Sequence, residues 1–242
     1  MKSDNKNKTK KITLVATCYN EGVFLAKFVA EAERVLGPTE YSAEFIFVDD
    51  ASNDNSKEEI KKICSERSDC KYIFHEKNVG RGGSVKEGLL MSGTAYAGFF
   101  DIDLEVSAKY IPDMLRLLEE GADVASVERV YDDPRGPYGL LRSVASAINK
   151  KLMRYVLKIR SSDPENGYKF FNMHPMRPII ENTQDPGWFW DVEVIAMAER
   201  AGKNIKFVPG DYIRDKNKKS TVRIFADSVA HLKGLYKFKK NL

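Results

Sequence analysis

The chain has 242 residues, of which 43% are hydrophobic, and its 39 basic and 35 acidic side chains leave a net charge of +4. Part of the positive excess lies in lysines at the two ends, so the middle of the chain is close to neutral or acidic, which argues against nucleic-acid binding. No stretch approaches the ~18 consecutive apolar residues of a membrane-spanning helix, and the polar N-terminus lacks the apolar run of a signal peptide. Three cysteines without a C-x-x-C pair favour a reduced, cytoplasmic setting.

Short β-branched or aromatic runs alternate with helical patterns over residues 12–128. This alternation predicts an α/β fold with a mostly parallel central sheet flanked by helices, because parallel strands are joined by helical crossovers. The predicted strands are residues 12–16, 44–48, 71–75, 96–100 and 122–127.

The helices between these strands have recognisable beginnings and ends. Apolar residues at helical spacing predict a helix over 23–36. Two capping boxes, Ser56-x-x-Glu59 and Ser84-x-x-Glu87, predict the starts of the next two helices.

The chain is predicted to form a single domain over residues 12–221, because no internal repeat or low-complexity linker divides it. A disordered basic tail (1–11) is expected before it and an amphipathic basic helix (222–242) after it. The later predicted elements are a long amphipathic helix over 140–157, a short apolar piece at 170–171, a helix over 191–201 and a strand over 205–208.

Polar residues gather directly after each of the first four predicted strands. Any one of these clusters has a local explanation, since Asn, Asp, Gly and Ser dominate turns. Open α/β sheets bind ligands at the carboxyl ends of their strands, so four clusters in succession predict a binding site at that edge. The clusters are residues 17–22, 49–54, 78–84 and 101–103.

Asp101 and Asp103 form a pair of carboxylates after the apolar run 96–100. In an extended chain, residues two apart share a face at roughly 6 to 7 Å. Such a pair suits Mg²⁺ or Mn²⁺, which takes one or two carboxylates together with phosphate oxygens and water. The alternative is a polar strand end that enters a turn.

Four motifs follow one another along the chain: T-x-Y-N-E from Thr17, V-D-D-x-S-x-D from Val48, N-x-G-R-G-G from Asn78 and D-x-D from Asp101. They stand in the order found in the inverting glycosyltransferases of family 2, and the chain resembles that family from about residue 12 to 227. The resemblance implies a GT-A fold, with a Rossmann-like nucleotide-binding sheet. Residues 128–131, 162–171 and 208–214 resemble more closely its polyprenyl-phosphate glycosyltransferases, such as dolichyl-phosphate mannose synthase.

The resemblance implies a site for a nucleotide-sugar donor, a GDP- or UDP-hexose. Tyr19 would offer a flat face to the base or ribose, and the carboxylate of Asp50 would accept hydrogen bonds from either. Gly80 and Gly82 would let the backbone approach the nucleotide, beside the fixed cation of Arg81. The implied donor-binding residues are Thr17, Tyr19, Glu21, Asp50, Gly80, Arg81, Asp101 and Lys219.

The resemblance further implies that Asp101 and Asp103 are catalytic residues that bind Mg²⁺ or Mn²⁺ as the cofactor. The metal ion would neutralise the leaving nucleoside diphosphate as the glycosidic bond breaks. Glu105 stands where the family usually has glutamine. It either adds a third carboxylate to the metal site or faces solvent.

The expected acceptor is a polyprenyl phosphate, dolichyl or undecaprenyl. A phosphomonoester has a second pKa of about 6, so it is an anionic nucleophile at neutral pH and needs cations to place it. The resemblance puts Arg129, Arg142 and Ser146 at the acceptor phosphate, and arginine forks suit phosphate oxygens. Arg142 and Ser146, four residues apart, would equally fit the solvated face of a helix.

A glycan hydroxyl, in cell-surface polysaccharide synthesis, is the alternative acceptor. A hydroxyl must lose a proton and therefore requires a general base. The candidates are Asp191, the third predicted catalytic residue, and Glu193, which follow the aromatic run 188–190. The interpretation favoured for Asp191 is that it serves as the N-cap of the helix that it begins, a role that aspartate fills well.

Two basic segments near the C-terminus, residues 214–219 and 222–242, each have two possible roles. Lys218 and Lys219 precede Ser220, whereas the lipid-phosphate enzymes commonly have serine before lysine. With Arg214, these lysines would close over the donor or the acceptor phosphate, or form a solvated charge run. Residues 222–242 would lie on an anionic membrane surface at its inner face, or pack on the domain.

A non-catalytic nucleotide-binding module is the alternative from another class. A nicotinamide-dependent oxidoreductase is disfavoured because the first strand is followed by T-C-Y-N-E-G and not by G-x-G-x-x-G. A sugar nucleotidyltransferase is disfavoured because a glycine-rich loop is missing at the same place. The oligomeric state is left open.

Overall fold

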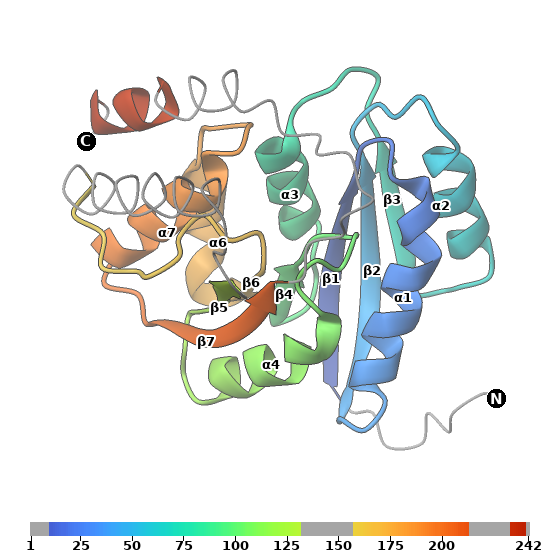
Figure 1. The fold of residues 1–242 in the computed structure, drawn as a ribbon, viewed down its shortest axis with the longest axis horizontal. Coiled ribbons are helices and arrows are strands. Elements are labelled where there is room, and N and C mark those ends of the chain that lie inside the picture. The colour runs from blue at the N-terminus through green and yellow to red at the C-terminus, as the bar shows by residue number, and fades with distance from the viewer. Residues whose placement is uncertain (1–9, 132–156, 213–232, 241–242) are drawn as a thin grey trace.

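The computed structural model describes residues 10–131, 157–212 and 233–240. These residues form one seven-stranded sheet in the order β3-β2-β1-β4-β6-β5-β7 (Figure 1). Within it, β6 runs antiparallel to its neighbours β4 and β5, and the other pairs are parallel. The strands are β1 (Lys10–Cys18), β2 (Tyr41–Asp49), β3 (Cys70–Phe74), β4 (Tyr96–Phe99), β5 (Val124–Tyr131), β6 (Lys169–Asn172) and β7 (Ile205–Tyr212).

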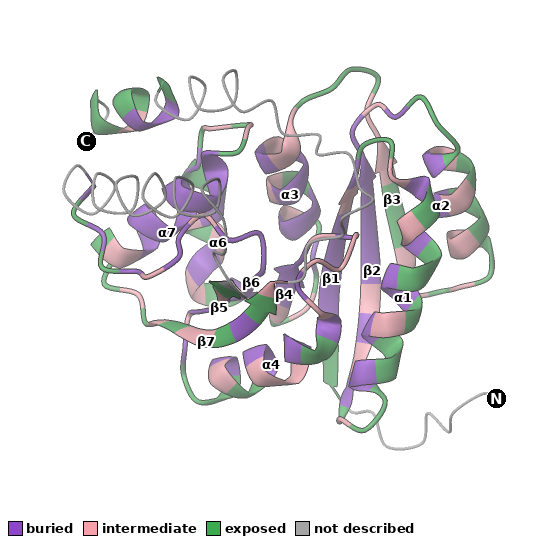
Figure 2. Cartoon of the chain, viewed as in Figure 1, coloured by how far each residue is buried: buried purple, intermediate pink, exposed green. Residues whose placement is uncertain are grey.

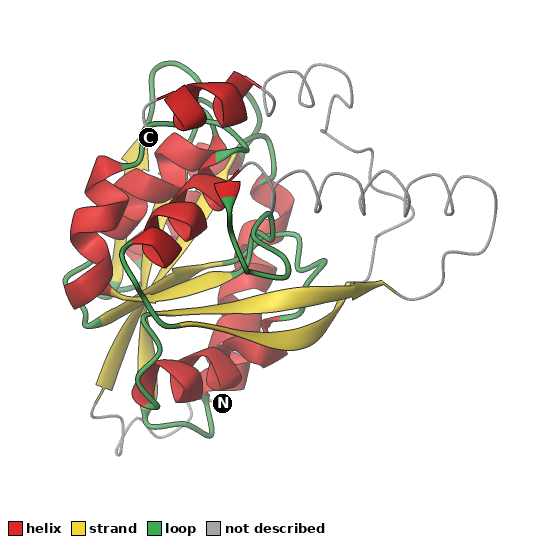
Figure 3. Ribbon diagram, turned by 90° about the vertical axis from the view of Figure 1, so that its left-hand side faces the viewer, coloured by secondary structure: helices red, strands yellow, loops and turns green. Residues whose placement is uncertain are grey.

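Helices cover both faces of the sheet (Figure 3). One face packs against α1, α2 and α4, and the other against α3, α6 and α7. None of the described helices is both long enough and apolar enough to cross a membrane. The helices are α1 (Gly22–Leu36), α2 (Ser56–Ser65), α3 (Arg81–Leu90), the short 3₁₀ helix η1 (Ala108–Tyr110), α4 (Ile111–Glu119), α6 (Met173–Asn182), α7 (Trp190–Arg200) and a helix over 233–240.

Side chains that alternate along the central strands fill the two cores. Phe45 and Phe47 of β2 belong to the core under α1, whereas Ile46 and Val48 belong to the core under α3. This follows from the two-residue period of a strand, which sends successive side chains to opposite faces. Figure 2 shows β1 and β2 buried along most of their length, and each such apolar side chain contributes roughly 1.5–3 kcal/mol.

The mostly parallel sheet expected from the sequence is confirmed. β1 begins at Lys10, two residues before its predicted start, and the apolar piece at 170–171 becomes the antiparallel strand β6. The helix predicted over 140–157 lies outside the described residues apart from Leu157.

The helix start predicted at Ser56 is confirmed, and the one predicted at Ser84 is wrong. Ser56 is already the first residue of α2, and Asn55 is its N-cap. α3 begins at Arg81 after Gly80, so Ser84 lies inside the helix, where its hydroxyl donates to the Gly80 carbonyl at 3.1 Å. Gly80 has a φ of 106°, a conformation that favours glycine, and this lets the chain enter the helix earlier than a capping serine would.

Gly88 of α3 tests how tightly that helix packs on the sheet, because a Cβ there would stand 2.4 Å from Cγ1 of Val15 in β1. We expect Gly88→Ala to lower the free energy of unfolding by about 1–3 kcal/mol, since overpacking outweighs the helix propensity gained. Gly93→Ala is the matched control, because a Cβ there meets nothing within 4 Å. Urea denaturation measures both. A Gly88→Ala protein as stable as the wild type would show that α3 can shift away from β1.

Candidate active site

The carboxyl ends of β2, β1 and β4 are neighbours in the sheet, and the loops that follow the first two are tied together. The N–H of Asn20 donates to Ser52 Oγ at 2.9 Å, and the N–H of Asn53 donates to Asn20 Oδ1 at 2.7 Å. Asn20 has a φ of 58°, which asparagine tolerates better than most residues. Two of the predicted polar clusters therefore form one surface.

The end of β1 and the loop after it carry the residues predicted to meet the nucleoside. Tyr19 is 45% exposed, which leaves its ring accessible to a base or ribose. Thr17 and Glu21 are half-buried on either side of it. Their contact with a nucleotide stays a prediction.

Asp50 is buried, and its carboxylate binds the chain itself. Oδ1 accepts the N–H of Val79 at 2.7 Å, and Oδ2 accepts the N–H of Gly80 at 2.8 Å. Oδ1 also lies 2.8 Å from Nδ1 of His75, a residue that the sequence reasoning missed because no motif marks it. Asp50 thus holds the loop between β3 and α3, and its direct contact with a nucleotide stays a prediction.

Arg81 joins two carboxylates from distant parts of the chain. Its Nη2 lies 2.9 Å from Asp101 Oδ1, and its Nη1 lies 2.6 Å from Asp191 Oδ2. The guanidinium carbon is 5.4 Å from the ring centre of Phe99 and 5.3 Å from that of Trp188, which are cation–π distances. Burial opposes the charge of Arg81, but Asp191 and Asp101 outweigh it and raise its pKa.

Lys169 completes this cluster and was also missed. Its side chain is 0% exposed, its Nζ lies 2.8 Å from Asp191 Oδ1, and it donates to the carbonyl of Asn166. Burial lowers the pKa of Lys169, and the attraction of Asp191 opposes that shift. The available signal was a lysine inside the apolar run 168–171, where a charge requires a buried partner.

The extended geometry expected for the two aspartates is wrong, because the chain turns directly after β4. The N–H of Leu104 donates to the carbonyl of Asp101 at 3.1 Å, and Leu104 has a φ of 61°. The N–H of Glu105 donates to Asp103 Oδ1 at 3.1 Å. Glu105 Oε2 accepts the hydroxyl of Tyr212 at 2.5 Å, so its predicted role as a metal ligand competes with this bond.

The donor set at this turn nevertheless fits a divalent cation that carries a diphosphate. Asp101 is 44% exposed at its side chain, and Asp103 is half-buried. Two partly accessible carboxylates leave coordination positions for phosphate oxygens and water, as Mg²⁺ prefers. Within the described part of the chain, no group of three or more His, Cys, Asp or Glu side chains is gathered around one point, so these residues alone offer no complete cage.

Of the predicted acceptor-phosphate residues, the structure describes Arg129. Its guanidinium binds Asp163 in a fork, with Nε to Oδ2 at 2.8 Å and Nη2 to Oδ1 at 2.9 Å. Asp163 is 1% exposed, so the pair anchors the end of β5 to the segment before β6. Arg142, Ser146, Lys218 and Lys219 lie outside the described residues.

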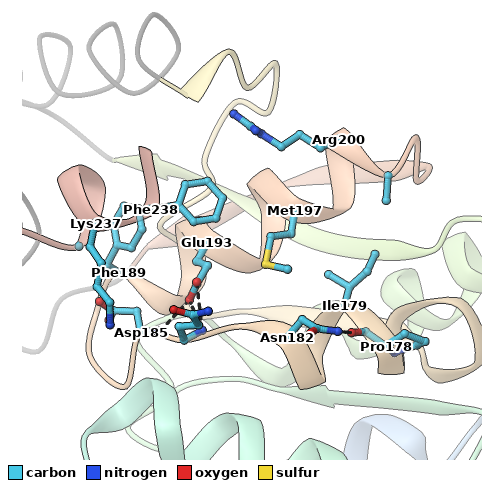
Figure 4. Close-up of a pocket in the computed structure, with 13 residues that line it drawn as sticks. Pro178, Ile179, Asn182, Asp185, Phe189, Glu193, Met197, Arg200, Lys237 and Phe238 are labelled. Atoms are coloured by element: carbon cyan, nitrogen blue, oxygen red, sulfur yellow. Dashed lines mark hydrogen bonds between the residues drawn. The ribbon is translucent and has the colours of Figure 1, made fainter. Parts of the chain in front are cut away.

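Glu193 lies beside a cavity of about 580 Å³ between α6, α7 and the helix 233–240 (Figure 4). Its carboxylate accepts the N–H of Gln184 at 3.0 Å and that of Asp185 at 2.8 Å. Burial raises the pKa of Glu193, and those backbone hydrogen bonds oppose the shift. Glu193 therefore fixes the turn that leads to Trp188, and both of its oxygens serve that purpose.

The helix cap expected at Asp191 is wrong. α7 begins at Trp190 with Phe189 as its N-cap, so Asp191 is inside the first turn. Its side chain is 2% exposed, and its two oxygens face Arg81 and Lys169. The partners of Asp191 lie outside its own helix, which a local capping pattern does not reveal.

We expect Asp191→Asn to lower the free energy of unfolding by about 3–5 kcal/mol, because it leaves Lys169 buried without an anionic partner. Adding Lys169→Met recovers part of that loss, since the double variant buries no unpaired ammonium. Glu120→Gln is the matched control: this carboxylate is 57% exposed and pairs with Arg116, so a change below ~0.5 kcal/mol is expected. Urea denaturation measures all three. A double variant less stable than Asp191→Asn alone would contradict this account of the cluster.

Comparison with known proteins finds relatives that share about a quarter of their residues with this chain. Glycosyltransferase AglD of Haloferax volcanii is 24% identical over 213 residues, which cover 83% of this chain and 33% of that protein. The dolichyl-phosphate beta-glucosyltransferase of Saccharomyces cerevisiae is 26% identical over 221 residues, which cover 82% of this chain and 65% of that protein. The chain thus spans less than two thirds of the length of each.

Among solved structures, the glucosyl-3-phosphoglycerate synthase of Mycobacterium tuberculosis, crystallised with Mn²⁺, UDP-glucose and phosphoglyceric acid, superposes with a TM-score of 0.69. It is 17% identical, and the superposition covers 96% of this chain and 80% of that one. This likeness confirms the GT-A fold. Residues 13–180 match the family described as Glycosyl transferase family 2, and this match covers more than half of the chain. The chain therefore belongs to glycosyl transferase family 2.

Proposed function

We propose that the protein transfers a hexose from GDP- or UDP-hexose to a polyprenyl phosphate, with inversion at the anomeric carbon and with the help of Mg²⁺ or Mn²⁺. The dolichyl-phosphate beta-glucosyltransferase among its relatives supports this acceptor class. The structural observation that carries the proposal is the burial of Asp191, because a buried and paired carboxylate is poorly placed to act as the general base that a hydroxyl acceptor needs.

A hydroxyl acceptor needs a base that it can reach, and the two candidates are both engaged. Asp191 is 2% exposed and bound by Arg81 and Lys169. Glu193 is 5% exposed and bound by backbone N–H groups. A lipid phosphate is ionised at neutral pH and needs neither carboxylate, so the geometry favours it over a glycan hydroxyl.

The donor would lie across the carboxyl edge of the sheet, with its base near Tyr19 and its diphosphate near the turn after β4. Asp101 and Asp103 would hold the metal ion, which neutralises the leaving diphosphate. Arg81, beside Asp101 at 2.9 Å, would add a fixed cation. We propose that Glu105 orders this turn through Tyr212.

The reaction is a single displacement. An oxygen of the acceptor phosphate forms a bond to the anomeric carbon while the bond from that carbon to the donor diphosphate breaks, and attack opposite the leaving group inverts the configuration. Arg129, Arg142 and Ser146 are the proposed acceptor-phosphate residues, and Lys219 is proposed to contact the donor.

A polyprenyl acceptor lies in a membrane, and the helix 233–240 has a surface that suits one. Tyr236 is 72% exposed, and its neighbours on this helix include exposed lysines. An aromatic side chain among lysines fits the interface of an anionic bilayer, so we propose peripheral contact with the cytoplasmic face of the membrane. The lysines are Lys233, Lys237, Lys239 and Lys240.

Thermal unfolding with nucleoside diphosphates tests the donor site. We expect UDP or GDP to raise Tm only when Mg²⁺ or Mn²⁺ is present, because a ligand at about 100 times its Kd stabilises the folded state by ~2.7 kcal/mol. Asp103→Asn should abolish the metal-dependent part of the shift. Asp113→Asn is the control, because this carboxylate of α4 is 49% exposed. A nucleotide shift that is independent of metal, or unchanged in Asp103→Asn, would count against the site.

Transfer of labelled hexose to a short polyprenyl phosphate, compared with the same alcohol without phosphate, tests the acceptor. We expect product from the phosphate alone, at a rate that falls below about pH 6 as the phosphate is protonated. Asp191→Asn, assayed where it is folded, should lose less than about tenfold in rate, whereas removal of a general base costs about 10²- to 10⁴-fold. Glycosylation of the alcohol, or loss of turnover with donor binding intact in Asp191→Asn, would favour the hydroxyl acceptor.

A further inference from the structure

His75 follows β3 and lies between the end of β2 and the helix α3. Its Nδ1 is 2.8 Å from Asp50 Oδ1, and its Nε2 is 2.8 Å from Glu87 Oε2. The side chain is 9% exposed, and the backbone N–H donates to the carbonyl of Asp49 at 2.9 Å. We call His75, Asp50 and Glu87 the His75 clamp.

Both contacts of the His75 ring require a proton. A carboxylate only accepts hydrogen bonds, and a neutral imidazole carries one N–H. A carboxylate oxygen at each ring nitrogen is therefore satisfied only by the imidazolium, which donates from both. Burial lowers the pKa of His75, but Asp50 from the end of β2 and Glu87 from α3 outweigh it and raise that pKa above its usual 6.5.

Asp50 connects the His75 clamp to the loop that opens α3. The oxygen that faces His75 also accepts the N–H of Val79 at 2.7 Å, and the second oxygen accepts the N–H of Gly80 at 2.8 Å. Gly80 is followed by Arg81, which reaches into the candidate active site. The charge of His75 thus acts on the loop through a single carboxylate.

We propose that His75 is a positioning residue for the nucleotide-sugar donor: its imidazolium holds Asp50 to α3 and thereby keeps residues 78–81 in the shape that binds the donor. This rests on the proposed donor, but on no particular acceptor. A histidine whose pKa is raised in the folded protein contributes stability that is fully present below about pH 6.5 and is lost as pH rises through the folded pKa. Donor binding should therefore weaken over that range.

The first experiment is an NMR titration of the imidazole resonances of the full chain. The chain has three histidines, so His75→Gln assigns the signal by its disappearance. We expect a pKa above 6.5 for His75, and a lower value in Glu87→Gln, because the amide removes one of the two charges. A wild-type value at or below 6.5 would overturn the proposal.

The second experiment measures the Kd of UDP or GDP with Mg²⁺ one pH unit below and one above the titrated pKa. We expect the wild-type Kd to rise about threefold to tenfold with pH, the equivalent of one hydrogen bond. His75→Gln should bind weakly at both values. Glu87→Gln should bind tightly at both, because a neutral imidazole then donates to Asp50 and accepts from the amide of Gln.

Glu58→Gln, an exposed carboxylate on α2, is the control and should follow the wild type. Comparing variants in one buffer removes the titration of the nucleotide itself. If His75→Gln shows the wild-type pH dependence, or if Glu87→Gln weakens binding as His75→Gln does, the proposal fails. If neither nucleotide binds the wild type at any pH, the proposed donor fails, and the NMR titration still decides whether the clamp is charged.

Discussion

Arg81 holds the candidate site together, because its two ion pairs join the turn after β4 to the first turn of α7. It binds Asp101 on one side and Asp191 on the other, and Lys169 from the start of β6 gives Asp191 a second cation. Two cations and two carboxylates leave this cluster without net charge. The pairing offsets the cost of removing these charged groups from water, which would otherwise destabilise the folded protein.

The neutrality of the cluster also bears on the donor. The proposed nucleotide-sugar donor would bring a negatively charged diphosphate to an edge where Asp101 is already paired and Asp103 adds a further carboxylate. Within this cluster, Arg81 and Lys169 are matched by carboxylates, so binding a diphosphate there requires additional positive charge. A divalent ion between these carboxylates and the phosphate oxygens supplies it, which is an electrostatic reason, independent of any motif, to expect a metal.

The strands and the edge where the site lies could be predicted from the sequence, because apolar periodicity and the clusters after each strand are local signals. The helix start predicted at Ser84 was wrong because distant partners hold the backbone before it, and the extended aspartate pair was wrong because the chain turns within residues 101–105. Val79 bonds to Asp50, 29 residues earlier, and Arg81 binds Asp191, 110 residues later. Gly80 shows the same effect: a Cβ there would stand 2.5 Å from the carbonyl of Pro186, so glycine is needed for chain packing whether or not a nucleotide approaches.

The burial of Asp191 bears on whether this side chain can act as a base for the acceptor. A general base takes a proton from the acceptor, whereas Asp191 is 2% exposed and binds Arg81, so we propose that it positions that guanidinium. An acceptor that arrives ionised needs no base, but it does need cations, because it must approach an anionic donor. Arg129 is matched by Asp163 and adds no net charge. We propose that the positive charge for the acceptor comes from residues beyond these pairs, among which the sequence offers Arg142, and that the buried cluster positions the donor.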